Sequence, residues 1–323
     1  MYSSSPKQPI FEVLQAGLQT TMQDGGRRGY RAVGVPESGA LDRFAYRAAN
    51  MLLSNTPEAA VLEVLLSGLR LRVLTATIVT VTGADLGAML DDSALPGWAT
   101  YTVEAGQQLA FMHRQRGARA YLGVAGGIAV DPVLSSRSTY LPDGWGGFEG
   151  RALRRGDIVE AYQGQRPRLR WLPPEHRPPY SSMPELRSIA GPHLHLFHAG
   201  AIKRWQATTY TLSNECDRMG YRLKGTGLDA AGTNLPSGGV LPGVVQVPPG
   251  GAPILLMADA QTTGGYPIIG TVIGADLPLA AQLLPGDQLR FRLVGLEAAR
   301  GALHDQQRWL QTVQEMMVEG AAV

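Results

Sequence analysis

An apolar run that stops at a dense group of polar side chains is the part of this chain best suited to chemistry. The run covers residues 253–258, and the polar residues that follow it are Asp259, Gln261, Thr262, Thr263 and Tyr266. Gly264 and Gly265 lie among them, and glycine lets a ligand approach the backbone closely. The group predicts a ligand-binding site at the end of a strand, on the rim of a core. A polar turn between two strands is the alternative.

A second group of similar composition follows the first predicted strand. Its side chains are those of Gln23, Asp24, Arg27 and Tyr30, with glycines at 25, 26 and 29. Such glycines allow backbone N–H groups to form an anion-binding concavity, and arginine can bind a carboxylate or a phosphate through two hydrogen bonds. The alternative is a glycine-rich loop in which Asp24 and Arg27 only pair with each other.

A third group, residues 215–223, holds two acids, two arginines and a thiol. Asp217 and Arg218 are suited to orient a carboxylate or amide substrate, and a structural ion pair at a turn is the alternative. A neighbouring arginine would favour the thiolate of Cys216, although a lone cysteine is more often a small buried residue.

Other candidates for chemistry are weaker. Ser38 lacks the Gly-x-Ser-x-Gly elbow of a nucleophilic serine, and Asp42 is placed to cap a helix. His193 and His195 would face the same way on a strand and could hold a metal, but no third ligand accompanies them. The sequence therefore predicts no metal site.

Composition narrows the class of protein. The 323 residues carry a net charge of +2 with 17% charged residues, which argues against a nucleic-acid partner. The single cysteine excludes an internal disulfide. Residues 1–9 lack the order of a signal peptide, and no apolar run reaches the length needed to span a bilayer. We therefore expect a cytoplasmic protein with no membrane partner.

Forty glycines and 22 prolines separate short apolar or alternating runs, which predicts a mainly β fold with a few helices. The expected helices cover 43–53, 277–284 and 297–319. The expected strands are 11–14, 69–74, 77–82, 108–112, 118–124, 157–162, 195–199, 210–213, 244–247, 254–257 and 288–294.

A proline-rich stretch over about 166–185 predicts a linker, because proline removes backbone donors and favours an extended chain. We therefore expect an N-terminal β-rich domain over 1–180, a C-terminal β domain over 181–296 and a terminal helix over 297–323. Barrel-like sheets would protect the edges of so many short strands.

Five segments occur here in an order that resembles one family. They are residues 20–42, Tyr-Leu-Gly-Val-Ala-Gly-Gly at 121–127, Ser-Arg-Ser-Thr at 136–139, Asp-Arg-Met-Gly-Tyr-Arg-Leu at 217–223, and 239–266. The chain resembles the KipA-type family, also described as allophanate-hydrolase-subunit-2-like or biotin-dependent carboxyltransferase. The resemblance implies two cyclophilin-like β-barrel domains. It also implies one subunit of an ATP-dependent 5-oxoprolinase, which opens 5-oxo-L-proline to L-glutamate together with KipI-type (B) and lactam-utilisation (A) subunits.

The resemblance also implies site residues. Asp259, Gln261, Thr262, Tyr266, Asp217 and Arg218 would form the catalytic group; Gln23, Asp24, Arg27, Tyr30, Gln246, Thr263, Gly264 and Gly265 would bind substrate across a cleft shared by both halves. Arg27 or Arg218 would hold a carboxylate or a phosphorylated intermediate, and Asp259 would act as a base. Gln246, Gln261 and Thr262 would hydrogen-bond the amide.

The sequence contains no Gly-x-x-x-x-Gly-Lys-Ser/Thr phosphate loop and no Met-Lys-Met biotin site. ATP would therefore be bound by one of the partners. Two alternatives remain: a carboxyltransferase subunit of a biotin-dependent urea or amide carboxylase, for which a partner carries the biotin, and a regulator that binds a KipI-type kinase inhibitor.

Overall fold

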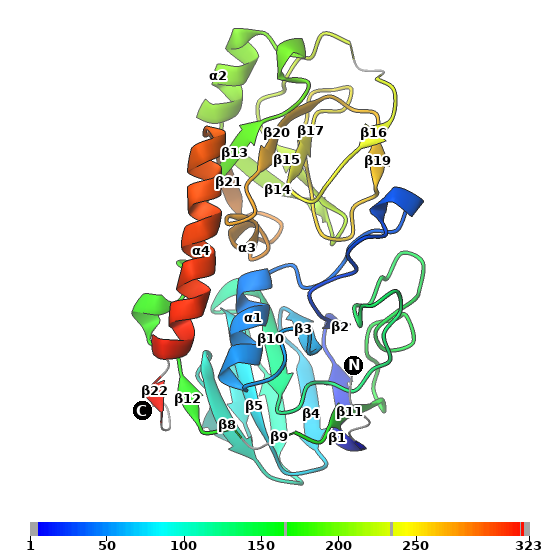
Figure 1. Cartoon of the computed structure of the whole chain (residues 1–323), viewed down its shortest axis with the longest axis vertical. Coiled ribbons are helices and arrows are strands. Elements are labelled where there is room, and N and C mark those ends of the chain that lie inside the picture. The colour runs from blue at the N-terminus through cyan, green and yellow to red at the C-terminus, as the bar shows by residue number, and fades with distance from the viewer. Residues whose placement is uncertain (1–5, 165–166, 233–234, 317, 320–323) are drawn as a thin grey trace. The chain divides into compact units, whose positions relative to one another are not determined.

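The computed structural model describes residues 6–164, 167–232, 235–316 and 318–319, and it is mainly β with four α-helices in the described part. The chain divides into two compact units (Figure 1). The first unit comprises Met1–Arg27, Asp42–Pro179 and Leu310–Val323. The second unit comprises Arg28–Leu41, hereafter the 28–41 segment, and Tyr180–Trp309.

The first unit contains a six-stranded antiparallel sheet with the order β11-β1-β4-β9-β6-β7. Its strands are β1 Lys7–Ala16, β4 Leu69–Val73, β6 Ala88–Leu90, β7 Ser93–Ala94, β9 Gln108–Phe111 and β11 Ile158–Tyr162. Polar and apolar residues alternate along β4, whose burial alternates with them, so that one face of this strand is buried and the other is solvated.

A second, seven-stranded sheet in the first unit has the order β2-β3-β10-β5-β8-β12-β22. Its strands are β2 Gln19–Gln23, β3 Val61–Leu65, β5 Thr77–Asp85, β8 Ala99–Val103, β10 Arg116–Val124, β12 Arg170–Trp171 and β22 Val318–Glu319. Apolar residues of both sheets, such as Phe11, Leu71, Val81 and Leu122, form one buried core. Strands β5 and β10 are buried along most of their length because the helix α1, Arg43–Leu52, also packs on them.

The second unit is built on a closed barrel with the order β13-β20-β17-β18-β15-β14-β21. The strands are β13 Glu185–Ala190, β14 Tyr210–Cys216, β15 Gly220–Lys224, β17 Val244–Gln246, β18 Ile254–Leu256, β20 Ile268–Val272 and β21 Gln288–Leu293. The pairing of β13 with β21 is parallel and closes the barrel, whereas the other pairs are antiparallel. Closure leaves no free strand edge in this sheet.

Alternation along three barrel strands defines an inner and an outer face. Tyr221, Leu223, Val245 and Leu255 belong to the large core of the second unit, which also contains Phe291. Their immediate neighbours in β15, β17 and β18 point the other way, since successive side chains of a strand lie on opposite faces. Two of these neighbours, Val244 and Leu256, form a separate small core with Val240, Ala260 and Ile268. The outer face of the barrel is therefore partly covered by the segments around 240 and 260.

Short elements complete the second unit. They are the helices α2 Ala199–Ala207 and α3 Leu277–Ala280, the 3-10 turns η1 Arg31–Val33 and η3 Leu194–Leu196, and the two-stranded ladder of β16 Gly238–Gly239 with β19 Thr263–Gly264. Trp205 of α2 is fully buried and stacks on Phe291, with ring centroids 5.1 Å apart. Gly270 makes this possible, because a Cβ there would lie 2.4 Å from the Trp205 ring.

The fourth helix, α4, runs over Leu296–Met316, close to the predicted 297–319. Leu310 and Val313 are its buried apolar residues, and the Gln306 amide donates to the carbonyl oxygen of Ala275 at 3.1 Å. No helix of the described residues combines the length and apolar character that crossing a membrane requires.

Most predicted elements are confirmed, whereas one predicted strand and one predicted helix differ. The predicted strand 195–199 is wrong: η3 occupies 194–196 and α2 begins at Ala199, where His198 Nδ1 accepts the backbone N–H of Ala201 at 3.1 Å. His193 and His195 therefore do not share a strand face. The predicted helix 277–284 ends early, at Ala280. The proline-rich stretch contains β12 and the 3-10 turn η2, Pro174–His176, in its described residues.

Candidate functional site

An open hollow of about 470 Å³ lies on the outer face of the barrel in the second unit. We call it the outer hollow. Its wall consists of the β14–β15 turn, outward-facing residues of β15, β17 and β18, and the segment 261–266 that follows β18. The outer hollow brings together four of the predicted site residues, namely Asp217, Gln246, Gln261 and Tyr266. These residues are up to 49 positions apart, from 217 to 266, and meet because β15, β18 and β17 are adjacent.

Gln246 lines the outer hollow, and its side-chain amide carries a buried donor. Its side chain is 2% exposed, and its Nε2 has no hydrogen-bond partner among the described residues. A buried donor without an acceptor costs free energy, and a ligand oxygen would remove that cost. Gly264 makes room for this amide, because a Cβ at position 264 would lie 2.6 Å from Nε2. The close approach of this side chain is one reason for a glycine at 264, and the predicted approach of a ligand to its backbone stays a prediction.

Gln261 and Tyr266 add an amide and a phenol to the wall of the outer hollow, and the Tyr266 side chain is 43% exposed. Thr262 is half-buried, and its carbonyl oxygen accepts the N–H of Val240 at 3.0 Å. Thr263 is exposed on β19, and Gly264 pairs with β16, so these residues fix the position of the wall.

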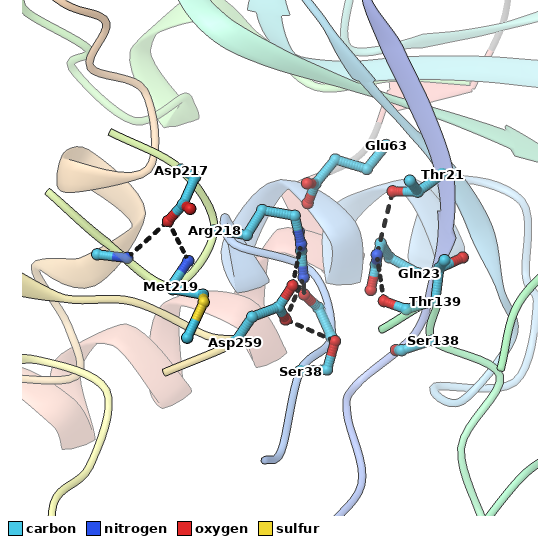
Figure 2. Close-up of polar contacts among 12 residues, drawn as sticks. Thr21, Gln23, Ser38, Glu63, Ser138, Thr139, Asp217, Arg218, Met219 and Asp259 are labelled. Carbon is cyan, nitrogen blue, oxygen red and sulfur yellow. Dashed lines mark hydrogen bonds and ion pairs between the residues drawn. The ribbon is translucent and has the colours of Figure 1, made fainter. Parts of the chain in front are cut away.

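Asp217 shapes the turn that borders the outer hollow. Its Oδ1 accepts the backbone N–H groups of Met219 at 2.7 Å and Gly220 at 3.1 Å, as Figure 2 shows for Met219. An aspartate that accepts N–H groups two and three residues ahead stabilises a tight turn. Asp217 is exposed, so its carboxylate also faces solvent at the edge of the hollow.

Cys216 lines the same hollow and is half-buried. Burial raises the pKa of its thiol, and the carboxylate of Asp217 raises that pKa further, against hydrogen bonds with Arg222 and Ser213 that lower it. A thiol with a raised pKa is mostly protonated at neutral pH and is a poor nucleophile. The structure thus favours a wall residue over the reactive thiolate that Arg218 was considered to promote.

Arg218 and Asp259 form a buried ion pair, which Figure 2 shows together with Ser38. Arg218 Nε donates to Asp259 Oδ2 at 2.8 Å, and Nη2 donates to Oδ1 at 3.1 Å. The Ser38 hydroxyl donates to Asp259 Oδ1 at 2.7 Å, and Arg218 Nη2 donates to the Gly39 carbonyl oxygen at 2.6 Å. The pair therefore holds the 28–41 segment through charge-assisted hydrogen bonds to Ser38 and Gly39.

The 28–41 segment has two further attachments within the second unit. The Ser38 N–H donates to the Ala258 carbonyl oxygen at 3.0 Å, and Arg31 Nη2 donates to the carbonyl oxygen of Val240. Ser38 has φ of 57°, an unusual conformation for a residue with a side chain. Tyr30 is half-buried at the start of η1 in this segment, and it does not line the outer hollow.

Three residues of the predicted N-terminal group, Gln23, Asp24 and Arg27, lie in the first unit and are buried. Asp24 accepts four hydrogen bonds: from the Ser136 and Ser138 hydroxyls and the Arg137 N–H at 2.6 Å each, and from the Gly26 N–H at 2.8 Å. The carboxylate thus joins two loops that are 112 or more residues apart.

Arg27 and Gln23 are also occupied within the first unit. The Arg27 guanidinium donates to the Ser138 carbonyl oxygen and stacks over Trp145, 4.2 Å from the ring centroid. Gln23 Nε2 donates to Thr21 Oγ1 at 3.1 Å and to the Thr139 carbonyl oxygen at 3.2 Å (Figure 2). Both side chains are fully buried, so they stabilise the loop that contains Ser136–Thr139.

The expectation of a single cleft shared by both halves stays a prediction. Two residues of the second unit have contacts that the sequence does not predict. The Ser38 hydroxyl binds Asp259, and no sequence signal marks that hydrogen bond. Arg222 carries a signal in hindsight, because it sits at an outward position between two buried residues of β15.

The fold and the site define a class: the chain belongs to the carboxyltransferase domain family, subdomains A and B, whose pattern matches residues 33–293. It is 41% identical to the C subunit of Escherichia coli 5-oxoprolinase over 312 residues, which cover 94% of this chain and 97% of that protein. The C subunit of the Haemophilus influenzae 5-oxoprolinase is 35% identical over 313 residues, covering 96% and 99%.

The structure of K. lactis urea amidolyase superposes on the whole chain with a TM-score of 0.89 and 27% identity, although this chain spans only 20% of that protein. The predicted family is thereby confirmed, and the chain is a homologue of the 5-oxoprolinase C subunit.

Proposed function

We propose that this chain acts as the C subunit of an ATP-dependent 5-oxoprolinase, which opens the lactam of 5-oxo-L-proline to give L-glutamate. One observation carries the proposal: the 41% identity to the C subunit of E. coli 5-oxoprolinase extends over nearly the full length of both chains. Similarity confined to one domain would support the fold without supporting the same role in a complex.

The outer hollow is the part of the second unit that we propose binds the lactam. A lactam carbonyl oxygen would accept a hydrogen bond from the unpartnered Nε2 of Gln246, and Gln261 and Tyr266 offer further hydrogen bonds to the amide. Hydrogen bonds to that oxygen stabilise charge that builds up on it when the amide is activated. We therefore assign Gln246 the role of polarising the carbonyl.

Asp259 and Arg218 would support this site indirectly, through the segments that they hold in place. Their carboxylate and guanidinium are occupied by each other and by the 28–41 segment, and both side chains are almost fully buried. We propose that the pair positions the 28–41 segment and the residues that lead into the wall segment 261–266. A direct role of Asp259 as a base requires release of Ser38 and Arg218 from it.

The sequence shows no recognisable site for ATP, because it contains no phosphate-binding loop. We propose that a partner subunit binds ATP. The partners proposed are the KipI-type (B) and lactam-utilisation (A) subunits.

We also propose that both units have cyclophilin-like folds. A closed antiparallel barrel with one parallel pair supports a cyclophilin-like assignment for the second unit, and the paired sheets around one core support a related arrangement in the first unit. Within the first unit, we propose that Gln23, Asp24 and Arg27 act as a framework that fixes the loop over Ser136–Thr139.

Reconstitution of the complex tests the proposed function. The purified partner subunits are assayed for ATP hydrolysis that depends on 5-oxo-L-proline and for glutamate release, with this chain present or omitted. We expect both signals to require the chain. Full activity without it would refute the proposal, and a folded variant such as Gln246→Ala should lower turnover while leaving the complex assembled.

A second function is favoured by the superposition on urea amidolyase, whose fold this chain shares over its whole length. Under this alternative the chain is the carboxyltransferase subunit of a urea or amide carboxylase, and a partner carries biotin. A biotin-carrying partner in a pull-down, together with urea-dependent ATP hydrolysis, would support it. A third alternative, a regulator that binds a KipI-type kinase inhibitor, predicts that a Gln246→Ala variant keeps full function.

A further inference from the structure

We infer that Arg222 binds the carboxylate of the substrate, and that the outer hollow therefore selects a lactam that carries a carboxylate over a neutral amide. The inference rests on the proposed function and names the residue that determines its specificity. It replaces Arg27 and Arg218, the two arginines expected from the sequence to hold this group.

Burial excludes the two expected arginines from the outer hollow. Arg27 lies in the first unit, is fully buried and stacks on Trp145, and Arg218 is 4% exposed and paired with Asp259. Neither guanidinium lines the hollow. A substrate carboxylate would have to break a buried ion pair to reach Arg218, which is a large cost.

Arg222 is placed by the alternation of β15. Tyr221 and Leu223 point into the barrel core, so Arg222 points outward, beside Ile254 of β18 in the ladder. Its side chain is 58% exposed and lines the outer hollow. It is the arginine in that wall among the described residues.

The current partner of Arg222 is easily replaced. Arg222 Nε lies 3.0 Å from Glu215 Oε2, and the Glu215 side chain is 74% exposed. Ion pairs between exposed side chains contribute little, because water screens them and both side chains lose freedom. A substrate carboxylate can therefore displace Glu215 and form the two parallel hydrogen bonds that a guanidinium makes with a carboxylate.

Two different groups in one wall make this a two-point site. The buried Nε2 of Gln246 has no partner among the described residues and suits a carbonyl oxygen, whereas Arg222 at the exposed edge suits an anion. The hollow, about 470 Å³, can enclose a small five-membered lactam with its carboxylate. A neutral lactam or urea would use only the first point.

The test compares Arg222→Gln with a matched control, Arg292→Gln. Arg292 is also an exposed arginine of the barrel, with Nε 2.5 Å from Glu185 Oε1, and it does not line the outer hollow. In the reconstituted complex we expect Arg222→Gln to raise KM for 5-oxo-L-proline about 10- to 100-fold with kcat within about twofold. Arg292→Gln should leave both unchanged.

Two further variants sharpen the comparison. Arg222→Lys keeps the charge but loses the two-fold geometry, so its KM should lie between those of the wild type and Arg222→Gln. Glu215→Gln removes the competitor for Arg222 and should lower KM by about two- to fivefold. An unchanged KM in Arg222→Gln, with an active wild-type complex, would overturn the inference and leave the proposed function standing.

A labelling experiment on the full chain tests the inference without activity. Cys216 is the only cysteine and lines the outer hollow, so its alkylation by iodoacetamide reports on occupancy. We expect 5-oxo-L-proline to slow labelling of the wild type, its neutral carboxamide to protect less, and Arg222→Gln to need about 10- to 100-fold more 5-oxo-L-proline for the same protection. Equal protection of both proteins would overturn the inference, and so would no protection of the wild type. An inactive wild-type complex would refute only the proposed function.

Discussion

Replacing Asp259 by asparagine should release the 28–41 segment from the rest of the second unit. Asparagine keeps the shape of the side chain but removes the charge that faces the Arg218 guanidinium at 2.8 and 3.1 Å. Both partners are almost fully buried, so the variant removes the carboxylate charge that faces a buried guanidinium. Breaking a buried pair in this way costs about 3–5 kcal/mol.

This cost is a large part of the stability of an ordinary domain, which is about 5–15 kcal/mol. Removing only the Ser38 hydroxyl, which donates to Asp259 Oδ1 at 2.7 Å, should cost about 1.5–3 kcal/mol. A control in the same unit is Glu185→Gln, which breaks the exposed Arg292–Glu185 pair and should cost about 0–1 kcal/mol.

Hydrogen exchange at the Ser38 amide measures this effect directly. That N–H donates to the Ala258 carbonyl oxygen at 3.0 Å and is protected while the 28–41 segment stays attached. Because about 1.4 kcal/mol is a tenfold change, Asp259→Asn should speed its exchange about 100-fold or more, and Ser38→Ala less. The loss of stability in an Arg218→Met/Asp259→Asn double variant should be smaller than the sum of the losses in the two single variants, by about 1–3 kcal/mol.

The result that would refute this reasoning is unchanged exchange in Asp259→Asn. If the variant is also inactive in the reconstituted complex, Asp259 acts as a base in the reaction instead of holding the 28–41 segment. Loss of activity together with fast exchange at Ser38 would instead assign its effect to positioning.

Two further predictions concern the wall of the outer hollow. Gly264→Ala should raise KM for 5-oxo-L-proline about tenfold with Tm almost unchanged, because the new Cβ would displace the flexible end of Gln246, 2.6 Å away. The matched control is Gly238→Ala, since Gly238 pairs with Gly264 in the β16–β19 ladder and has open space at its Cβ position. Equal KM values for the two variants would contradict the assigned role of Gln246. The rate of Cys216 alkylation should rise with pH around a midpoint that is higher in the folded chain than in urea, because burial raises the pKa of this thiol. Rates of iodoacetamide labelling in both states measure the two midpoints, and a lower midpoint in the folded chain would show a stabilised thiolate.

Local sequence patterns determined much of the fold. Alternation of apolar and polar residues identified strands such as β4, β11 and β21, and Asp42 before an apolar helical period identified the start of α1, where its Oδ1 accepts the Ala45 N–H at 2.9 Å. These signals involve residues within one or two turns of each other, so they do not depend on the rest of the molecule. The strand expected over 195–199 was wrong because histidines and leucines at alternate positions also fit a 3-10 turn followed by a helix cap.

Sequence patterns and the family resemblance together nominated four residues of the outer hollow, but not which of the predicted side chains are paired within the protein. Asp217, Gln246, Gln261 and Tyr266 were predicted as site residues, and the structure gathers them around one hollow. Their sequence positions indicate polarity and nearby glycines, which is enough to nominate a site. The sequence positions do not show which of these side chains are paired with other groups of the protein.

Only the tertiary structure decided which side chains are paired. Arg218 and Arg222 lie four residues apart in one charged segment, yet Arg218 is buried against Asp259 while Arg222 faces the outer hollow. The difference arises because the carbonyl oxygen of Gly39, 179 residues from Arg218, accepts a hydrogen bond from it, and because Ser38 donates to its partner Asp259. Barrel closure in turn fixes the outward face of β15. Burial and pairing depend on such distant partners, whereas a sequence pattern reports only on near neighbours.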